Sequence, residues 1–330
     1  MTHRFLVIGS NSFSGAQFVK HLLTLGHEVT GVSRSPELHD VFLPYKWLPD
    51  QARFTFRQID LNHDLDSLSA LLDESRPPYI VNFAAQGMVA QSWETPEHWY
   101  QTNVVAQVKL HDRLRKLPFL KKYVHVTTPE AYGSTDGWIE ENFHFAPSTP
   151  YAVSRAACDL HLMSFFKAYG FPVVFTRAAN VYGPGQQLYR IIPRAMLYAR
   201  LGKKMQLHGG GKSIRSFIHM DDVSDATLRV ATDGTPGDSY HISTGASISI
   251  ADLIHKISAL TGTDFESLAE VSGDRLGKDQ AYLLASDKLR GELNWKDRVD
   301  LDEGLKQTLG WIDANLDTLA KLPADYIHKP

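Results

Sequence analysis

The sequence predicts an α/β protein with a Rossmann-type, doubly wound parallel sheet and a smaller α/β lobe in the C-terminal half. Short apolar runs alternate with helical patterns through the first 180 residues, and a glycine-containing loop follows the first run. Alternation of this kind forms βαβ units, in which helices cover both faces of a parallel sheet. With 330 residues, 43% of them hydrophobic, the chain can bury one large or two smaller cores.

The expected strands are runs rich in apolar and β-branched residues. They cover residues 4–9, 27–33, 54–60, 79–85, 123–128 and 172–178, and the helical patterns cover 14–25, 64–75, 96–116 and 151–169. Gly26 stands where the first helix is expected to end, because glycine suits the backbone beyond a helix C-terminus. After Tyr182, glycine and proline gather in YGPGQQ and HGGGKS, which predicts a less regular lobe with some segments returning to the sheet.

The charge balance excludes several classes of partner. Lys and Arg total 34 against 37 Asp and Glu, a net charge of −3, so nothing favours nucleic acid or an anionic membrane. The first apolar run is too short for a secretion signal, and no run approaches the ~18 residues that span a bilayer. The single Cys158 excludes an intrachain disulfide and favours a reducing compartment. We therefore expect a cytoplasmic protein.

The stretch VIGSNSFSG lies between the first expected strand and the first expected helix. Gly9 and Gly15 occupy the outer glycine positions of a dinucleotide-binding loop, where one makes the tight turn and the other allows close helix–strand contact. The middle position, commonly glycine, is Ser12. Phe13 and Ser14 open the helix whose N-terminus would bind the pyrophosphate. The sequence thus predicts a dinucleotide-binding domain over residues 1–180.

The end of the second expected strand bears on the choice of cofactor. An NAD site usually offers an acidic residue there to the ribose 2′-hydroxyl, but this chain has Ser33 and Arg34. Because a guanidinium pairs well with a phosphate, Arg34 favours NADP, and NAD remains the alternative.

The helical pattern over 151–169 begins with YAVSR, in which Tyr151 and Arg155 are one turn apart. A tyrosine acts as a base only as phenolate, and a fixed cation stabilises that form. About twenty residues upstream, HVTTPEAYG places Thr128 and Glu130 at the end of an expected strand. Since open parallel sheets bind ligands at this edge, these four residues are the candidate catalytic group.

Several motifs resemble the extended short-chain dehydrogenase/reductase family, in its branch of nucleotide-sugar 4,6-dehydratases and epimerases. TTPEAYG and YAVSRAACD resemble the catalytic segments of dTDP-glucose and GDP-mannose 4,6-dehydratases, and NVYGPGQ, SIRSFIHMDDV and DRLGKD resemble their later segments. The resemblance covers essentially the whole chain. It implies a nucleotide-sugar-binding lobe over 181–330, cofactor contacts at Asp60, Leu61, Ala84, Ala85, Gln86 and Asn103, and substrate contacts at Glu130, Asn180, Arg190, Arg215 and Arg275.

The resemblance implies a nucleotide-sugar 4,6-dehydratase that makes a 4-keto-6-deoxy sugar by internal hydride transfer. Tyr151 would take the 4-hydroxyl proton, with Thr128 hydrogen-bonded to the same oxygen, and Glu130 would take the C5 proton. Tyr151 and Arg155 would also bind the cofactor, with Arg155 holding the phenolate and the cofactor ribose. The family's acidic aspartate is replaced by Pro129 and its catalytic lysine by Arg155. The alternatives are a nucleotide-sugar 4-epimerase or decarboxylase and, in another class, a non-catalytic NADP-binding module on a decayed dehydratase scaffold.

Two further expectations concern metals and assembly. HMDD (219–222) contains metal-ligand types, but Asp221 is expected to be the N-cap of the next helix, and no metal is predicted. The pattern over 151–169 is apolar on more than one face, which predicts burial on both sides. By resemblance, this helix and the one over 96–116 would pack against a second copy to form a homodimer.

Overall fold

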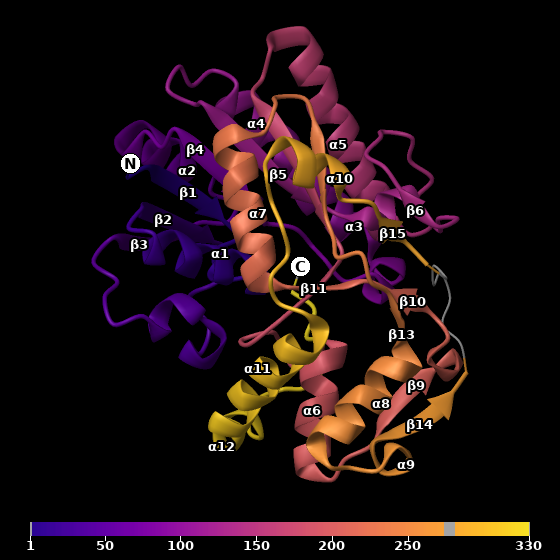
Figure 1. The fold of residues 1–330 in the computed structure, drawn as a ribbon. Coiled ribbons are helices and arrows are strands. Elements are labelled where there is room, and N and C mark those ends of the chain that lie inside the picture. Colours follow the sequence, from indigo (N-terminus) through magenta and orange to yellow (C-terminus); the bar gives the residue numbers. More distant parts are fainter. Residues whose placement is uncertain (1, 274–280, 330) are drawn as a thin grey trace.

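The protein is organised around a seven-stranded, all-parallel sheet, shown in the computed structural model of Figure 1, which describes residues 2–273 and 281–329. The strand order is β12-β7-β5-β4-β1-β2-β3, so the chain runs outward in both directions from β1. The strands are β1 Arg4–Ile8, β2 Glu28–Ser33, β3 Phe54–Gln58, β4 Tyr79–Asn82, β5 Lys122–Thr127, β7 Val173–Ala178 and β12 Ser239–Ile242. The expected fold class and the six expected strands are confirmed.

Helices cover both faces of this sheet. One core cluster joins it to α1 Phe13–Thr24 and α7 Met220–Asp233, and another joins it to α2 Leu65–Ser75, α4 Ala106–Leu114 and α5 Pro150–Tyr169. Helix α5 starts where Thr149 caps it and Pro150 fits the first turn, and it ends at Gly170 with a left-handed backbone. The expected 96–116 helix is divided into α3 Pro96–Tyr100, a π-helical turn η4 Gln101–Val105 and α4.

The smaller lobe has its own core and lies below the sheet in Figure 1. Its main elements are α6 Ile191–Leu201, β9 Met205–His208, α8 Ile250–Thr261, α9 Phe265–Leu268, β14 Ala269–Ser272, α11 Leu301–Ala314 and α12 Leu316–Leu319. The remaining short elements form three two-stranded sheets, which pair β8 Asn180–Tyr182 with β11 Phe217–His219, β10 Ile214–Arg215 with β13 Ile248–Ser249, and β6 Trp138–Ile139 with β15 Leu283–Leu284. Helix α10 Asp287–Glu292 packs into the core of the main sheet. Because β12 and α7 return to the sheet, the lobes are not separated by a single cut of the chain.

The start of α7 corrects one expectation. The N-cap is His219 and not Asp221, since His219 has extended backbone angles and its Nδ1 accepts a hydrogen bond from the Asp221 N–H at 3.3 Å. Asp221 instead lies in the first turn, where a carboxylate favours the positive end of the helix dipole. The helix therefore begins two residues earlier than the pattern suggested.

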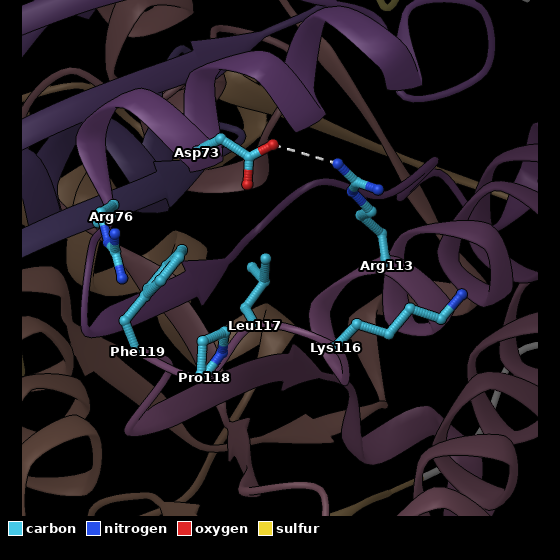
Figure 2. Close-up of a pocket in the computed structure, with 7 residues that line it drawn as sticks. All are labelled: Asp73, Arg76, Arg113, Lys116, Leu117, Pro118 and Phe119. Carbon is cyan, nitrogen blue, oxygen red and sulfur yellow. Dashed lines mark hydrogen bonds and ion pairs between the residues drawn. The ribbon is translucent and has the colours of Figure 1, made fainter.

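A surface hollow lies at the end of the sheet opposite the predicted site. It encloses about 370 Å³ between the C-terminal end of α2 and the segment after α4, where Arg76, Arg113 and Phe119 line it (Figure 2). Asp73 pairs with Arg113 across it at 3.2 Å. None of the candidate catalytic or cofactor residues is among its lining residues, so this hollow plays no part in the site below. Within the described residues, no helix is long and apolar enough to span a bilayer.

Candidate active site

The glycine loop after β1 forms a backbone cradle. Gly9 has a positive φ of 83°, and a Cβ there would lie 2.7 Å from the Ala84 nitrogen. A Cβ on Gly15 would lie 2.1 Å from the Gly9 carbonyl oxygen. Neither position tolerates a side chain without backbone movement, so both glycines are required by the turn that leads into α1.

Ser12, which replaces the middle glycine, caps α1. Its hydroxyl donates to the Gly9 carbonyl at 2.7 Å and accepts from the Gly15 N–H at 3.0 Å. Phe13 and Ser14 then form the first turn, where N–H groups have no partner inside the helix. This arrangement fits a dinucleotide pyrophosphate, which needs exposed N–H groups at a helix N-terminus and close approach of the backbone.

The loop is tied to the end of β2 by Asn11, a residue that the sequence reasoning missed. The Asn11 N–H donates to the Ser33 hydroxyl at 2.9 Å, and its side-chain amide donates to the carbonyls of Ser35 and Pro36 at 3.0 Å. The segment that carries Arg34 is therefore fixed relative to the glycine loop. The local sequence did not indicate this role for Asn11, because asparagine is common in turns and loops.

Four more predicted cofactor residues follow β3 and β4. Asp60 accepts the Asn62 N–H on its carboxylate at 2.8 Å, and the neighbouring Leu61 is buried. The Ala84 N–H donates to the Asn82 side chain at 2.9 Å, whereas Ala85 is exposed. All four lie on loops at the carboxyl edge of the sheet, beside the switch in strand order between β1 and β4, where open parallel sheets bind ligands.

Asn103 fixes the geometry of this edge. It lies in the π-helical turn and is fully buried. Its side-chain oxygen accepts the Gln86 N–H at 2.8 Å, and its amide donates to the Gln86 carbonyl at 3.0 Å and to the Ser154 hydroxyl at 2.9 Å. Asn103 thus joins the loop after β4 to α5. The irregular turn directs this side chain inward, a use of π-turns that is frequent at functional sites.

The segment 324–329 lies against the predicted cofactor residues. The Lys329 carbonyl accepts from the Gln86 amide at 2.6 Å and from the Arg34 guanidinium at 3.0 Å. The His328 ring stacks on Trp99 with centroids 5.0 Å apart. Arg194, on α6, pairs with Asp325 at 2.9 Å. The segment therefore connects α6 of the smaller lobe to two loops of the predicted cofactor site, the one after β2 that carries Arg34 and the one after β4 that carries Gln86.

Thr128, Glu130 and Tyr151 meet at the end of β5. Thr128 caps the short 3-10 helix η5 Pro129–Tyr132 and accepts the Glu130 N–H at 3.3 Å. The Tyr151 N–H is held by the buried Ser92 hydroxyl at 3.2 Å. The Tyr151 phenol forms a hydrogen bond with Thr128 and is close enough to the Glu130 carboxylate to feel its charge. The structure therefore brings three of the four predicted catalytic side chains together.

Burial raises the pKa of Tyr151, and the nearby Glu130 carboxylate raises it further. Arg155, the Thr128 hydrogen bond and Arg190 act in the opposite direction without cancelling the rise. The charge of Arg155 alone therefore does not give the lowered tyrosine pKa that a base requires. The positive charge of a nicotinamide ring favours the phenolate in the same way as any nearby cation.

Arg155 points into the protein interior. Its side chain is 2% exposed, and its Nη2 donates to the Val126 carbonyl and lies 3.4 Å from the His125 Nε2. Its charge still lowers the pKa of Tyr151. Direct contact of this guanidinium with a cofactor ribose stays a prediction.

Beneath the catalytic edge, Asp159 and Arg177 form a fully buried ion pair at 2.8 Å. Asp159 also accepts from the Thr127 hydroxyl at 3.0 Å, and Arg177 donates to the Thr128 carbonyl at 3.1 Å. The pair therefore fixes the end of β5 directly under the catalytic threonine. Asp159 is the last residue of the YAVSRAACD motif, and its place in that motif was the only feature of the sequence that could have indicated this structural role.

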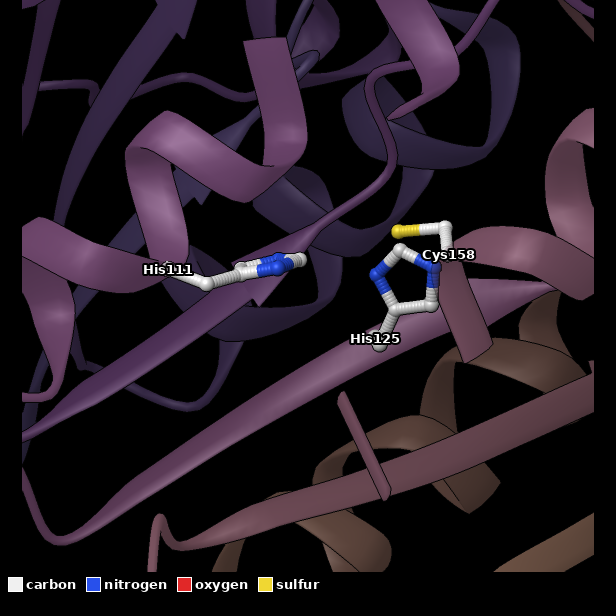
Figure 3. A group of neighbouring side chains, drawn as sticks. All are labelled: His111, His125 and Cys158. Atoms are coloured by element: carbon white, nitrogen blue, oxygen red, sulfur yellow. The ribbon is translucent and has the colours of Figure 1, made fainter. Parts of the chain in front are cut away.

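His111, His125 and Cys158 form a buried group beside this pair (Figure 3), with candidate ligand atoms within 4.8 Å of one another. The histidines already share the Tyr123 hydroxyl, at 3.0 and 3.4 Å. The Arg155 guanidinium next to His125 places a positive charge where a metal cation would bind. Burial lowers the pKa of both histidines, so they are neutral members of a hydrogen-bond network. The group gives no argument for a metal, and the absence of one stays a prediction.

Asn180 and Arg215, two predicted substrate residues, meet at Tyr282. The Tyr282 hydroxyl donates to the Asn180 side-chain oxygen at 2.9 Å, and the Arg215 guanidinium lies over the tyrosine ring, 4.4 Å from its centroid. Tyr282 is buried, and Glu130 and Tyr151 both raise its pKa, so it belongs to the same cluster. Sequence reasoning missed this tyrosine, because nothing in its local sequence marks it.

The other two predicted substrate residues are not part of the contacts around Tyr282. Arg190 is the exposed N-cap residue of α6, and its charge lowers the pKa of Tyr151. Arg275 lies outside the described residues. The site as a whole offers a base of tunable pKa, a carboxylate and cations beside a dinucleotide cradle, which suits redox and proton-transfer chemistry on an anionic substrate.

The comparisons with known proteins agree with this geometry. The family model described as GDP-mannose 4,6 dehydratase matches residues 6–308. This chain belongs to that family. It is 33% identical over 333 residues to a dTDP-glucose 4,6-dehydratase of Streptomyces antibioticus, with 97% of this chain and 96% of the relative covered.

Some relatives of this family member are longer proteins. It is 32% identical over 266 residues to the trifunctional UDP-glucose 4,6-dehydratase, 3,5-epimerase and reductase RHM2 of Arabidopsis thaliana, which covers 79% of this chain. The chain spans about 40% of the length of that plant protein. Any function of the longer protein is therefore not carried over as a whole.

Solved structures of dehydratases and epimerases share the fold. The dTDP-glucose 4,6-dehydratase DesIV of Streptomyces venezuelae, with NAD bound, has a TM-score of 0.88 at 29% identity and covers 95% of this chain and 98% of its own. A UDP-glucose 4-epimerase of Thermotoga maritima has a TM-score of 0.86 at 26% identity, with 95% and 99% covered. Overall shape therefore does not separate the two reactions within the family.

Proposed function

We propose that the protein is a nucleotide-sugar 4,6-dehydratase, a lyase that converts a nucleotide-diphosphate hexose into the 4-keto-6-deoxy sugar. The observation that carries the proposal is the placement of the Glu130 carboxylate beside the Tyr151 phenol, at the edge that also bears the glycine cradle. A redox reaction alone needs the tyrosine and the cofactor. A carboxylate at the same point supplies the second base that elimination of water requires.

The side chains divide the work as follows. Tyr151, as phenolate, takes the proton of the sugar 4-hydroxyl, with Thr128 hydrogen-bonded to the same phenol oxygen. The bound nicotinamide supplies the acceptor and later the donor of the hydride that moves from C4 to C6. The resulting 4-keto group makes the C5 proton acidic, and Glu130 removes it. Arg190 and Arg215 supply positive charge for the diphosphate of the substrate.

We propose NAD as the cofactor, in place of the NADP that Arg34 suggested from the sequence. The similar dehydratases of Streptomyces venezuelae and Bacillus anthracis carry NAD. Arg34 also has a partner in the protein, because its guanidinium donates to the Lys329 carbonyl. Titration of cofactor-stripped protein with NAD and NADP, monitored by calorimetry, tests this choice, and tighter binding of NADP would overturn it.

The decisive experiment is mass spectrometry of products from a panel of GDP-, UDP-, dTDP- and CDP-hexoses. We expect one donor to lose water, and we expect Glu130→Gln to abolish that loss. Glu74→Gln, which changes an exposed glutamate on α2, is the matched control and keeps full activity. A sugar of unchanged mass but altered stereochemistry would support the 4-epimerase alternative. A nucleotide hexuronic acid added to the panel tests the decarboxylase, because its C6 carboxylate can be lost as carbon dioxide. No reaction with any donor would support the non-catalytic scaffold.

We also propose a homodimer formed through α3, η4 and α5. These helices carry large apolar side chains that are exposed in the single chain: Tyr100, Val105, Val153, Leu160 and Tyr169. The expected burial of α5 on both sides is therefore not reached within one copy. Light scattering after gel filtration tests the dimer, with Leu160→Glu expected to shift it to monomer and a monomeric wild type contradicting it. A cytoplasmic location, favoured by the single buried Cys158, accompanies this proposal.

A further inference from the structure

The proposed reaction leaves one proton unassigned. When the C6–O bond breaks, the departing hydroxide must receive a proton, and the family's aspartate is replaced here by Pro129, which has no proton to give. Glu130 is occupied by the C5 proton during the same step. A second proton donor on the substrate side of the site would complete the chemistry.

Three backbone contacts place Tyr282 at this point. The Thr135 N–H donates to the Ala281 carbonyl at 3.0 Å, and the Leu283 N–H donates to the Thr135 hydroxyl at 3.2 Å. Ala281 also forms a β-bridge with Ile214, next to Arg215. Tyr282 is thus held between the segment that follows Glu130 and the strand that carries Arg215.

The side chain of Tyr282 is prepared to hold and release a proton. Its hydroxyl donates to the Asn180 side-chain oxygen at 2.9 Å, and the phenol proton turns from that oxygen to the substrate for the transfer. Burial and the Glu130 carboxylate raise the pKa of Tyr282, so the phenol keeps its proton until the step that needs it. The Arg215 guanidinium over the ring lowers that pKa, which stabilises the phenolate left after transfer.

We propose that Tyr282 is the general acid for water loss, a role that takes the place of the missing carboxylic acid and rests on the proposed dehydratase function. In the elimination step the C5–H bond breaks and its proton goes to Glu130, while a C5–C6 double bond forms. The C6–O bond breaks, the oxygen keeps the bonding pair, and it takes the Tyr282 proton to leave as water. The Tyr282 phenolate regains a proton from Tyr151, which holds the one removed from the 4-hydroxyl.

This assignment closes the proton balance. Glu130 returns its proton to C5 when C6 is reduced, so Glu130, Tyr151 and Tyr282 all end in their starting forms. The substrate has then lost the C6 oxygen with its hydrogen and the proton of the 4-hydroxyl, which together are one water. No outside acid or oxidant is required.

The test compares two leaving groups in Tyr282→Phe. With the natural hydroxyl at C6, the variant is expected to lose water about 10²–10⁴-fold more slowly than wild type, the usual size of a general-acid effect. It should still exchange the C5 hydrogen for solvent deuterium, because Tyr151 and Glu130 are intact. With the 6-deoxy-6-fluoro sugar, fluoride leaves without protonation, so fluoride release is expected within a few-fold of wild type.

The outcomes are separable. An equal fall in rate with both leaving groups would assign Tyr282 a positioning role and overturn the proposal. A normal rate of water elimination in the variant would overturn it too. Tyr198→Phe, a tyrosine of α6 in the smaller lobe, is the matched control and is expected to behave as wild type. Thermal unfolding of both variants detects misfolding. If wild type releases no water from any donor, the proposed function itself fails, a result distinct from the failure of Tyr282 alone.

Discussion

Two polar layers lie one helical turn apart along α5, and they are built differently. The reaction cluster (Thr128, Glu130, Tyr151 and Tyr282) sits at the carboxyl edge of the sheet and draws its members from separated parts of the chain. The ionic network (His125, Arg155, Asp159 and Arg177) lies beneath it and is almost wholly buried. Within it Asp159 pairs with Arg177, whereas the Arg155 guanidinium donates to the Val126 carbonyl and lies beside the neutral His125. Burial perturbs the pKa values of both tyrosines in the reaction cluster.

The difference shows that neighbouring polar residues of one motif can have different roles, one in the reaction and the other in the stability of the fold. Tyr151 and Arg155 are separated by a single turn, yet one is directed to the reaction cluster and the other to the ionic network. The network fixes the end of β5, through the bonds of Asp159 to Thr127 and of Arg177 to the Thr128 carbonyl. Mutations should therefore separate the layers: changes in the reaction cluster reduce the rate, and changes in the ionic network reduce stability.

The largest effect is expected for Tyr151→Phe. Without the phenol no side chain takes the 4-hydroxyl proton, so turnover should fall about 10⁴-fold, the upper range for loss of a general base. The melting temperature should stay near that of wild type. Rates by product mass spectrometry and stability by thermal unfolding check both halves, with Tyr198→Phe on α6 as control. Substantial remaining turnover would show that the base lies elsewhere.

Asp159→Ala should act through stability. The change leaves Arg177 buried without its carboxylate, and breaking a buried ion pair typically costs about 3–5 kcal/mol of folding free energy. Urea unfolding measures the loss. Asp112→Ala, which breaks exposed ion pairs with Arg115 and Lys116, should cost only about 1 kcal/mol. A stable Asp159→Ala protein with reduced turnover would place Asp159 in the chemistry instead.

The ionic network should also make stability depend on pH. Burial holds the pKa of His125 well below 6.5, so this histidine stays neutral when folded and takes up a proton when the chain unfolds at lower pH. The free energy of unfolding should therefore fall as pH drops below about 6.5, by up to about 1.4 kcal/mol per pH unit for each such histidine. Urea unfolding at pH 7.5, 6.5 and 5.5 measures the slope. His125→Gln should reduce the slope by the contribution of one proton, and an unchanged slope would contradict this role.

The smallest effect is expected for Arg155→Lys, which restores the residue type common in the family. Lysine keeps the charge near Tyr151 but loses the guanidinium contacts to the Val126 carbonyl and His125. Stability should fall by about 1 kcal/mol, the usual value of a hydrogen bond, and turnover should change less than about tenfold. A hundredfold loss of turnover at unchanged stability would show that the guanidinium serves the tyrosine or the cofactor directly.

Local sequence patterns were sufficient for much of this molecule. The strands followed from apolar runs, and Gly9 and Gly15 from their spacing between a strand and a helix. Thr128, Glu130 and Tyr151 could be placed together because parallel strands end at one edge. These predictions depend on short-range order and on the regularity of βαβ units.

The residues that escaped prediction depend on long-range packing. Tyr282 reaches the site because residues 135 and 214 bond to its neighbours, and no local pattern encodes that contact. The inward direction of Arg155 follows from the Val126 carbonyl and His125 on the adjacent strand, whereas its spacing from Tyr151 suggested only a shared face. His219 caps α7 because its backbone is extended, and this conformation is set by the fold and not by the residue type.

The segment 324–329 has a thermodynamic consequence for cofactor affinity. Arg34 and Gln86 both donate to the Lys329 carbonyl, so a dinucleotide that bonds to these side chains must first displace it. The observed dissociation constant then equals the intrinsic one divided by the fraction of molecules in which the segment is released. Any change that loosens Asp325 from Arg194 or His328 from Trp99 raises that fraction. Cofactor retention is in this way set partly by residues that never touch the dinucleotide.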